Sequence, residues 1–129
     1  MNITDKIVLT ILLLLGLLTL FLSSSIIFDL FEIREMEGNY VGFVVWANFI
    51  SAILYIITAL DFILRKKWNW RYLGVSFVVL LIATISFWVY VANGGIYEVK
   101  TIKAIIFRLT FTGILLSIIF IKYKKGLKK

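Results

Sequence analysis

The residues that could do chemistry in this sequence are few, and they lie inside or beside long apolar segments. Arg108 falls about one turn inside the segment 104–121, and Asp29 and Asp61 lie near the ends of two other segments. An ionisable side chain is costly inside a membrane unless it pairs or faces water, so each is a candidate functional residue. Asn48 adds an amide that needs hydrogen-bond partners where water is scarce. These four side chains are the first candidates for a site.

Polar residues at one side of the expected membrane predict an outward-facing polar cleft. In an antiparallel bundle they lie at a similar depth, near the ends of the crossing segments. We expect Arg108 to pair with Glu32 or Glu98 at the mouth of a pocket. In the alternative interpretation these residues only cap the bundle, and Arg108 extends to the lipid head groups. The predicted ligand-binding residues are Glu32, Tyr40, Asn48, Tyr90, Asn93, Glu98 and Arg108.

Asp61 has a simpler structural explanation than the other ionisable residues. Arg65 follows it by four residues, which is the spacing at which a carboxylate and a guanidinium pair on one face of a helix. We therefore expect an ion pair near the membrane surface. A proton or cation relay through Asp61 is the alternative.

The sequence lacks the two residue types on which much enzyme and metal chemistry depends. It has no histidine and no cysteine, which removes the usual haem ligand, the commonest zinc and copper ligands and the usual base for a serine nucleophile. We therefore predict no metal site, no cofactor and no catalytic residue. An enzyme that uses only glutamate, arginine and tyrosine is the least favoured alternative.

Four apolar segments must position these residues. They cover residues 7–28, 41–64, 72–91 and 104–121, and about 20 residues of helix span a hydrocarbon core of about 30 Å. The chain is 62% hydrophobic with a mean hydropathy of +1.03, well above the values of soluble domains. Short connections favour antiparallel neighbours. The sequence predicts an all-α integral membrane bundle of four transmembrane helices in a single domain, residues 1–129.

The basic residues indicate how the bundle is oriented. Ten of the fourteen lysines and arginines lie before residue 7, between 65 and 71, or after 121. Because basic residues favour the cytoplasmic side, both termini are predicted to be cytoplasmic. Cleavage of a signal peptide near Ser23–Ser25 is the alternative, and it would leave three crossings. We therefore attribute the net charge of +7 to orientation signals and to contacts with anionic lipid head groups, and we do not expect nucleic-acid binding.

One face of the segment 41–64 carries small and polar side chains at helical spacing. Small residues let membrane helices approach closely, and hydroxyl groups can form hydrogen bonds between helices. We therefore expect this face to point into the bundle, together with Gly16, Thr19 and Ser23 of the first segment. The face consists of Asn48, Ser51, Ala52, Tyr55, Thr58, Ala59 and Phe62.

Residues 37–49 and 93–98, together with Arg108, resemble a group of small bacterial membrane proteins. The layout of four helices in this length is similar to that of the DoxX-like membrane proteins. The resemblance implies a compact bundle in the bacterial inner membrane, often an accessory to redox or stress systems. It implies no catalytic residues.

The function that we expect from the sequence is non-catalytic. The chain is predicted to be an accessory subunit, or to bind a lipid-like molecule through its outer polar cleft. Its expected partners are membrane lipids, other membrane subunits or further copies of itself. A small oligomeric transporter or channel is the alternative, although the leucine-rich and isoleucine-rich first and fourth segments argue against a continuous aqueous path.

Overall fold

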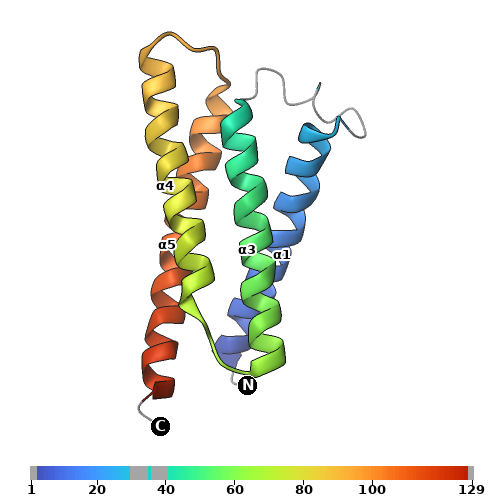
Figure 1. Ribbon diagram of the computed structural model, residues 1–129, viewed down its shortest axis with the longest axis vertical. Helices are drawn as coiled ribbons and strands as arrows, with labels where there is room; N and C mark the ends of the chain where they lie inside the picture. The colour runs from blue at the N-terminus through green and yellow to red at the C-terminus, as the bar shows by residue number, and fades with distance from the viewer. Residues whose placement is uncertain (1–2, 30–34, 36–40, 128–129) are drawn as a thin grey trace.

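The computed structural model describes residues 3–29, 35 and 41–127, and this part of the chain forms four long helices (Figure 1). Each helix is long and apolar enough to cross a membrane. Successive helices run in opposite directions, so the start of the first and the end of the last lie at the same end of the molecule. The predicted all-α four-helix membrane bundle is therefore confirmed. The helices are α1 Ile3–Ile27, α3 Gly42–Arg65, α4 Trp70–Ala92 and α5 Val99–Leu127.

Two helices extend well beyond the apolar segments that predicted them. α1 begins at Ile3 rather than at residue 7, and α5 runs from Val99 to Leu127 rather than from 104 to 121. Hydropathy marks only the part of a helix that lies in hydrocarbon. α5 continues beyond its apolar part because the lysines at its two ends are good helix formers. With 29 residues, α5 is about 43 Å long.

The turn between α3 and α4 depends on one residue in an unusual conformation. Lys66 ends α3 with φ 57° and ψ 28°, in the left-handed region, and its N–H donates to the carbonyl oxygen of Phe62 at 2.7 Å. The Asn69 side chain accepts the N–H of Arg71 at 3.0 Å and caps the start of α4. A side-chain acceptor at this position satisfies one of the unpaired N–H groups of a helix start.

The turn between α4 and α5 also begins with a residue in the left-handed region, which here is a glycine. Gly94 has φ 81° and donates its N–H to Val91, while Gly95 donates to Tyr90, both at 3.0 Å. This pair of hydrogen bonds is the Schellman arrangement that commonly ends a helix. Asn93 is the last residue before the glycine pair and caps α4.

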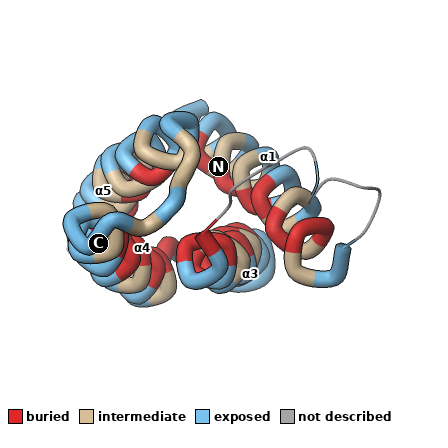
Figure 2. Tube along the Cα trace, turned by 90° about the horizontal axis from the view of Figure 1, so that it is seen from above, coloured by how far each residue is buried: buried red, intermediate tan, exposed pale blue. Residues whose placement is uncertain are grey.

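The helices pack against one another in chain order, α1 on α3, α3 on α4 and α4 on α5, as Figure 2 shows from above. α1 and α3 approach closely at Gly16, where an added Cβ would lie 2.8 Å from Cγ1 of Ile56 and 3.4 Å from the carbonyl oxygen of Ala52. The small and polar face of α3 is buried from Ser51 to Phe62. The prediction that this face points into the bundle is confirmed.

Two separate clusters of buried side chains divide the bundle into a terminal half and a distal half. The terminal half contains the start of α1, the α3–α4 turn and the end of α5, and all four helices contribute to its core. The distal half lies at the other end, and its described hydrophobic cluster comes from α4, α5 and the start of α3, while Ile26 of α1 is buried outside this cluster. The terminal core is Val8, Leu12, Tyr55, Ala59, Phe62, Trp68, Leu73, Leu115 and Ile119, and the distal core is Val41, Val44, Ala47, Ala83, Phe87 and Ile105.

A polar cluster closes the terminal half. One carboxylate oxygen of Asp5 on α1 is 2.7 Å from Nζ of Lys122 on α5 and accepts the indole N–H of Trp68 at 2.9 Å. The Trp68 ring stacks on Phe62 with centroids 3.9 Å apart. The predicted pair of Asp61 with Arg65 is also present, with Nε and Oδ1 2.9 Å apart.

Candidate functional site

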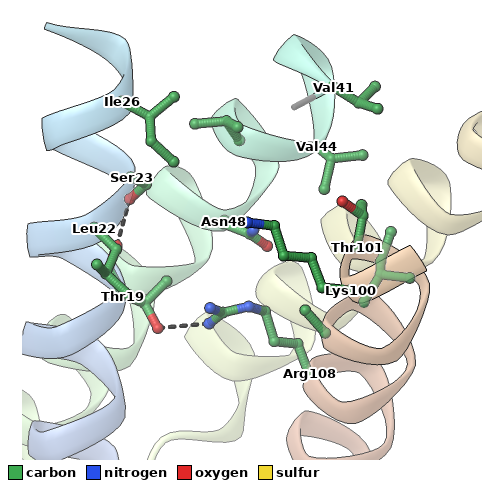
Figure 3. A pocket seen from close by; sticks show the side chains of 13 residues that line it. Thr19, Leu22, Ser23, Ile26, Val41, Val44, Asn48, Lys100, Thr101 and Arg108 are labelled. Carbon is green, nitrogen blue, oxygen red and sulfur yellow. Dashed lines mark hydrogen bonds between the residues drawn. The ribbon is translucent and has the colours of Figure 1, made fainter. Parts of the chain in front are cut away.

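A cavity of about 170 Å³ lies in the distal half, where α1, α3 and α5 surround it (Figure 3). It occurs beside the distal hydrophobic cluster, to which the described part of α1 does not belong. In Figure 1, α1 leans away from α5 toward this end, and the two helices make few close backbone contacts. The cavity therefore follows from the divergence of α1. Its described lining residues are Thr19, Leu22, Ser23, Ile26, Val41, Val44, Val45, Asn48, Lys100, Thr101, Ala104, Ile105 and Arg108.

Arg108 joins the two helices that diverge. Its Nη1 donates to the hydroxyl oxygen of Thr19 at 2.6 Å, so the guanidinium extends from α5 to α1 across the cavity (Figure 3). The Ser23 hydroxyl, one turn further along α1, donates to the main-chain oxygen of Thr19. A guanidinium presents several donors in one plane and is suited to carboxylate or phosphate groups.

Lys100 brings a second positive charge to the cavity. Lys100, Ala104 and Arg108 follow one another at intervals of four residues, which places them along one side of α5. Both charged side chains extend from α5 toward the other two lining helices (Figure 3). Ala104 between them has a small side chain and leaves space in the cavity wall. The charged part of the site is thus a strip on a single helix.

Asn48 supplies a neutral polar group from α3. Its side-chain oxygen is buried and has no hydrogen-bond partner among the described residues. Buried polar atoms in folded proteins nearly always have a partner, which can be an ordered water or a ligand. Because Asn48 also lines the cavity, its oxygen is a natural contact for a molecule bound there.

The rest of the lining is apolar. Branched aliphatic side chains from all three helices form most of the wall, so the cavity joins a cationic strip to a hydrocarbon surface. Such a surface fits a molecule that has both a polar and an apolar part. The apolar lining residues are Leu22, Ile26, Val41, Val44, Val45, Ala104 and Ile105.

Buried polar side chains continue from the cavity toward the terminal end along α3. Ser51 on α3 is buried beneath Asn48, and one turn further Tyr55 and Thr112 share a hydrogen bond between α3 and α5. The apolar terminal core follows, with Leu12, Phe62 and its other members. Thr58 is buried one turn beyond Tyr55, so a narrow stripe of polar side chains on α3 runs beside this core toward Asp61.

Only some of the predicted site residues that the structure describes line the cavity. Asn48 and Arg108 both line the cavity, whereas Tyr90, Asn93 and Glu98 are not among its described lining residues. Tyr90 instead covers the α4–α5 turn, where its hydroxyl donates to the carbonyl oxygen of Ile96 at 2.7 Å. Glu32 and Tyr40 lie outside the described residues.

The pairing of Arg108 with Glu32 or Glu98 stays a prediction. The Arg108 contact that the structure gives is with the hydroxyl group of Thr19 on α1. A pair with Glu32 involves a residue outside the described part of the chain, and a pair with Glu98 stays a prediction.

Sequence reasoning missed four polar lining residues, Thr19, Ser23, Lys100 and Thr101. Thr19 and Ser23 were interpreted as packing residues, because small hydroxyl side chains are common between membrane helices. Charge sorting alone places Lys100 on the outer side of the membrane and does not indicate that it lines a cavity. The four-residue spacing from Lys100 through Ala104 to Arg108 was the signal that could have placed Lys100 beside Arg108.

Comparisons with known proteins add no assignment. No protein-family model, curated protein or solved structure matches this chain. Within the described residues, no three histidine, cysteine or acidic side chains are grouped so that they could hold a metal ion. The function must therefore be argued from the cavity itself.

Proposed function

We propose that this chain is a non-catalytic membrane protein that binds a lipid-like amphiphile in the cavity between α1, α3 and α5. One observation carries the proposal. The cavity has Lys100, Arg108 and Asn48 on a mainly aliphatic wall, and it is formed by helices that cross a membrane. A ligand with a polar group and a hydrocarbon part matches both surfaces.

The distribution of basic residues supports an orientation for this site. The predicted cytoplasmic side, rich in lysine and arginine, corresponds to the terminal half. The cavity then lies in the outer half of the membrane, which we propose to be the bacterial inner membrane on the basis of the DoxX-like layout. The bound molecule would come from the outer leaflet.

A role as an accessory subunit is compatible with this proposal, because a lipid-binding bundle can belong to a larger complex. The transporter or channel alternative has less support. Ser51, Tyr55 and Thr58 form a buried polar stripe on α3, but they pack beside the apolar core that contains Leu12, Phe62 and Ile119, and a conducting path would need open space there.

Native mass spectrometry of gently extracted protein tests the proposal, since retained lipids and partner chains are weighed together. Ala104→Trp fills the cavity wall, and Ile106→Trp is the matched control on an exposed part of α5 outside the cavity. Wild type and Ile106→Trp should retain a lipid-like molecule that Ala104→Trp loses. Equal retention by all three proteins, or no retention by any, would contradict binding in this cavity. A stable complex with other subunits would add an accessory role.

A further inference from the structure

Two neighbouring polar side chains of α3 lack a hydrogen-bond partner. The side-chain oxygen of Asn48 and the hydroxyl oxygen of Ser51 are both buried, and neither has a partner among the described residues. An unpaired polar atom is costly inside a bundle of membrane-spanning helices. These two atoms therefore mark a place where a bound molecule would gain hydrogen bonds.

Several other buried hydroxyl groups of the described helices are satisfied within their own helix. They donate to the main-chain carbonyl oxygen four residues earlier, as is usual for serine and threonine in membrane helices. These groups belong to Ser23, Ser25, Thr58 and Thr84. The hydroxyl group of Ser51 does not make such a bond, so it is available for a partner outside α3.

Asn48 is the member of the pair that a ligand reaches first. It lines the cavity from α3 (Figure 3) and is only partly buried, whereas Ser51 is 1% exposed and lies one turn deeper. The last torsion of an asparagine side chain is broad, so a rotation of the amide presents its oxygen to the cavity. Residues three apart on a helix have Cβ atoms about 5 to 6 Å apart. One oxygen atom placed between Asn48 and Ser51 can therefore bond to both.

The hydrogen-bonding needs of the two side chains restrict the chemistry of this atom. An amide oxygen only accepts hydrogen bonds, whereas a serine hydroxyl group both donates and accepts. A hydroxyl group on the ligand meets both needs, because it can donate to Asn48 and accept from Ser51. An ether, an ester or an ionised carboxylate has no hydrogen to donate and leaves the Asn48 oxygen unpaired.

We propose that the ligand is an amphiphile whose polar end carries a hydroxyl group, which donates to Oδ1 of Asn48 and accepts the hydroxyl hydrogen of Ser51. This inference rests on the proposed function and names the chemical class of its ligand. A cavity of about 170 Å³ is close in size to one that holds benzene, so it takes the hydroxyl end and the first few carbons. The remaining hydrocarbon extends into the surrounding lipid between α1 and α5, where the two backbones make few close contacts.

The test is a competition between two probes for delipidated full-length protein in detergent, measured by native mass spectrometry. The probes are dioctanoylglycerol with one free hydroxyl group and the methyl ether of the same molecule. They share their acyl chains and ester groups, and their masses distinguish them in one sample. Wild type should bind the alcohol about fivefold to tenfold more tightly than the ether, because the ether leaves a buried acceptor without a donor.

Variants connect this preference to the two side chains. Asn48→Leu removes the amide at similar size and should remove most of the preference, and Ser51→Ala should reduce it. Ser25→Ala is the matched control, since it removes an equally buried hydroxyl group from α1 outside the cavity and should leave the preference unchanged. Ala104→Trp should lose both probes. Ser51→Ala keeps the test valid even if Asn48→Leu does not fold.

The contrary outcomes separate the two proposals. Equal binding of alcohol and ether by wild type, with both probes lost in Ala104→Trp, would overturn hydroxyl recognition while leaving the proposed amphiphile site in place. A preference that survives in Asn48→Leu and Ser51→Ala, or that falls as much in Ser25→Ala as in Ser51→Ala, would overturn the placement of the hydroxyl group. Undiminished binding of both probes by Ala104→Trp, or no binding by wild type, would overturn both proposals.

Discussion

The two halves of the bundle differ in how α1 and α5 are held together. In the terminal half, Asp5 on α1 contacts both Lys122 on α5 and Trp68 in the α3–α4 turn, and the core below them includes all four helices. In the distal half, the main hydrophobic cluster takes no residue from the described part of α1, and a hydrogen bond from Arg108 to Thr19 links α5 with α1.

The two ends of the bundle also differ in the charged side chains that they contain. The terminal cluster pairs a carboxylate with an ammonium group, so its charges are compensated within the protein. The distal cavity has two cations and no carboxylate among its described lining residues. Closed packing around a pair of opposite charges favours stability, whereas an open cavity with polar and apolar walls favours binding of another molecule. We expect mutations to separate these two properties.

The largest effect on stability is expected from Trp68→Ala in the terminal half. The substitution removes the ring stacked on Phe62 and the hydrogen bond to Asp5, and truncating a buried tryptophan costs about 3 to 5 kcal/mol. The free energy of unfolding in mixed micelles measures it. Trp88→Ala is the control, because Trp88 on α4 is 53% exposed and should change stability by no more than about 0.5 kcal/mol. Equal losses would contradict the distinction between the halves.

The next effect concerns the carboxylate of Asp5. Asp5→Ala should destabilise the protein by about 1.5 to 3 kcal/mol, since it removes two hydrogen bonds to a charged group. Asp61→Ala breaks a pair whose Arg65 side chain is 58% exposed, so it should cost only about 0.3 to 0.5 kcal/mol. A double-mutant cycle with Lys122→Ala measures the coupling. A coupling near zero would mean that Asp5 and Lys122 do not hold the terminal ends of α1 and α5 together.

A smaller effect is expected at the boundary between the two halves, where Tyr55 bonds to Thr112. Tyr55→Phe should cost about 0.6 to 1.7 kcal/mol, the usual range for hydrogen bonds between membrane helices. Adding Thr112→Val should cost little more, because both changes break the same bond. Ser117→Ala is the control, since its hydroxyl is exposed and bonds within its own helix. Fully additive losses at Tyr55 and Thr112 would show that the bond contributes no stability.

The smallest effects are expected at the two turns, and they should have opposite signs. Gly94→Ala places a Cβ at a residue with φ 81° and should destabilise the distal turn by about 1 kcal/mol. Lys66→Gly relieves a non-glycine residue at φ 57° and should stabilise the terminal turn by about 0.5 kcal/mol. Thermal unfolding of both variants checks the signs. A loss of stability in Lys66→Gly would mean that the lysine side chain contributes more than its backbone conformation costs.

Much of the fold could be predicted because the signals involved are local. Four apolar segments of sufficient length require four helices, since a backbone in hydrocarbon must satisfy its own hydrogen bonds. The pair of Asp61 with Arg65 needed only the helical spacing of four residues. The inward face of α3 followed from its small and polar residues for the same reason.

The site was predicted only in part, because its residues meet through packing rather than through spacing. Asn48 and Arg108 were chosen for their polarity inside a membrane span, and both line the cavity. Tyr90 was chosen for its depth in the membrane. It covers the turn after α4 instead, because the bare backbone of Gly95 leaves room for its ring.

The sequence by itself determined the four crossings and the sorting of charge between the two membrane sides, because hydropathy and charge act residue by residue. Only the tertiary structure decided that α1 diverges from α5 in the distal half and that Lys100, Arg108, Thr19 and Asn48 therefore share one cavity. The rotation and tilt of each helix depend on contacts such as Gly16 against Ala52. Such contacts join residues far apart in the chain, and no local pattern in the sequence specifies them.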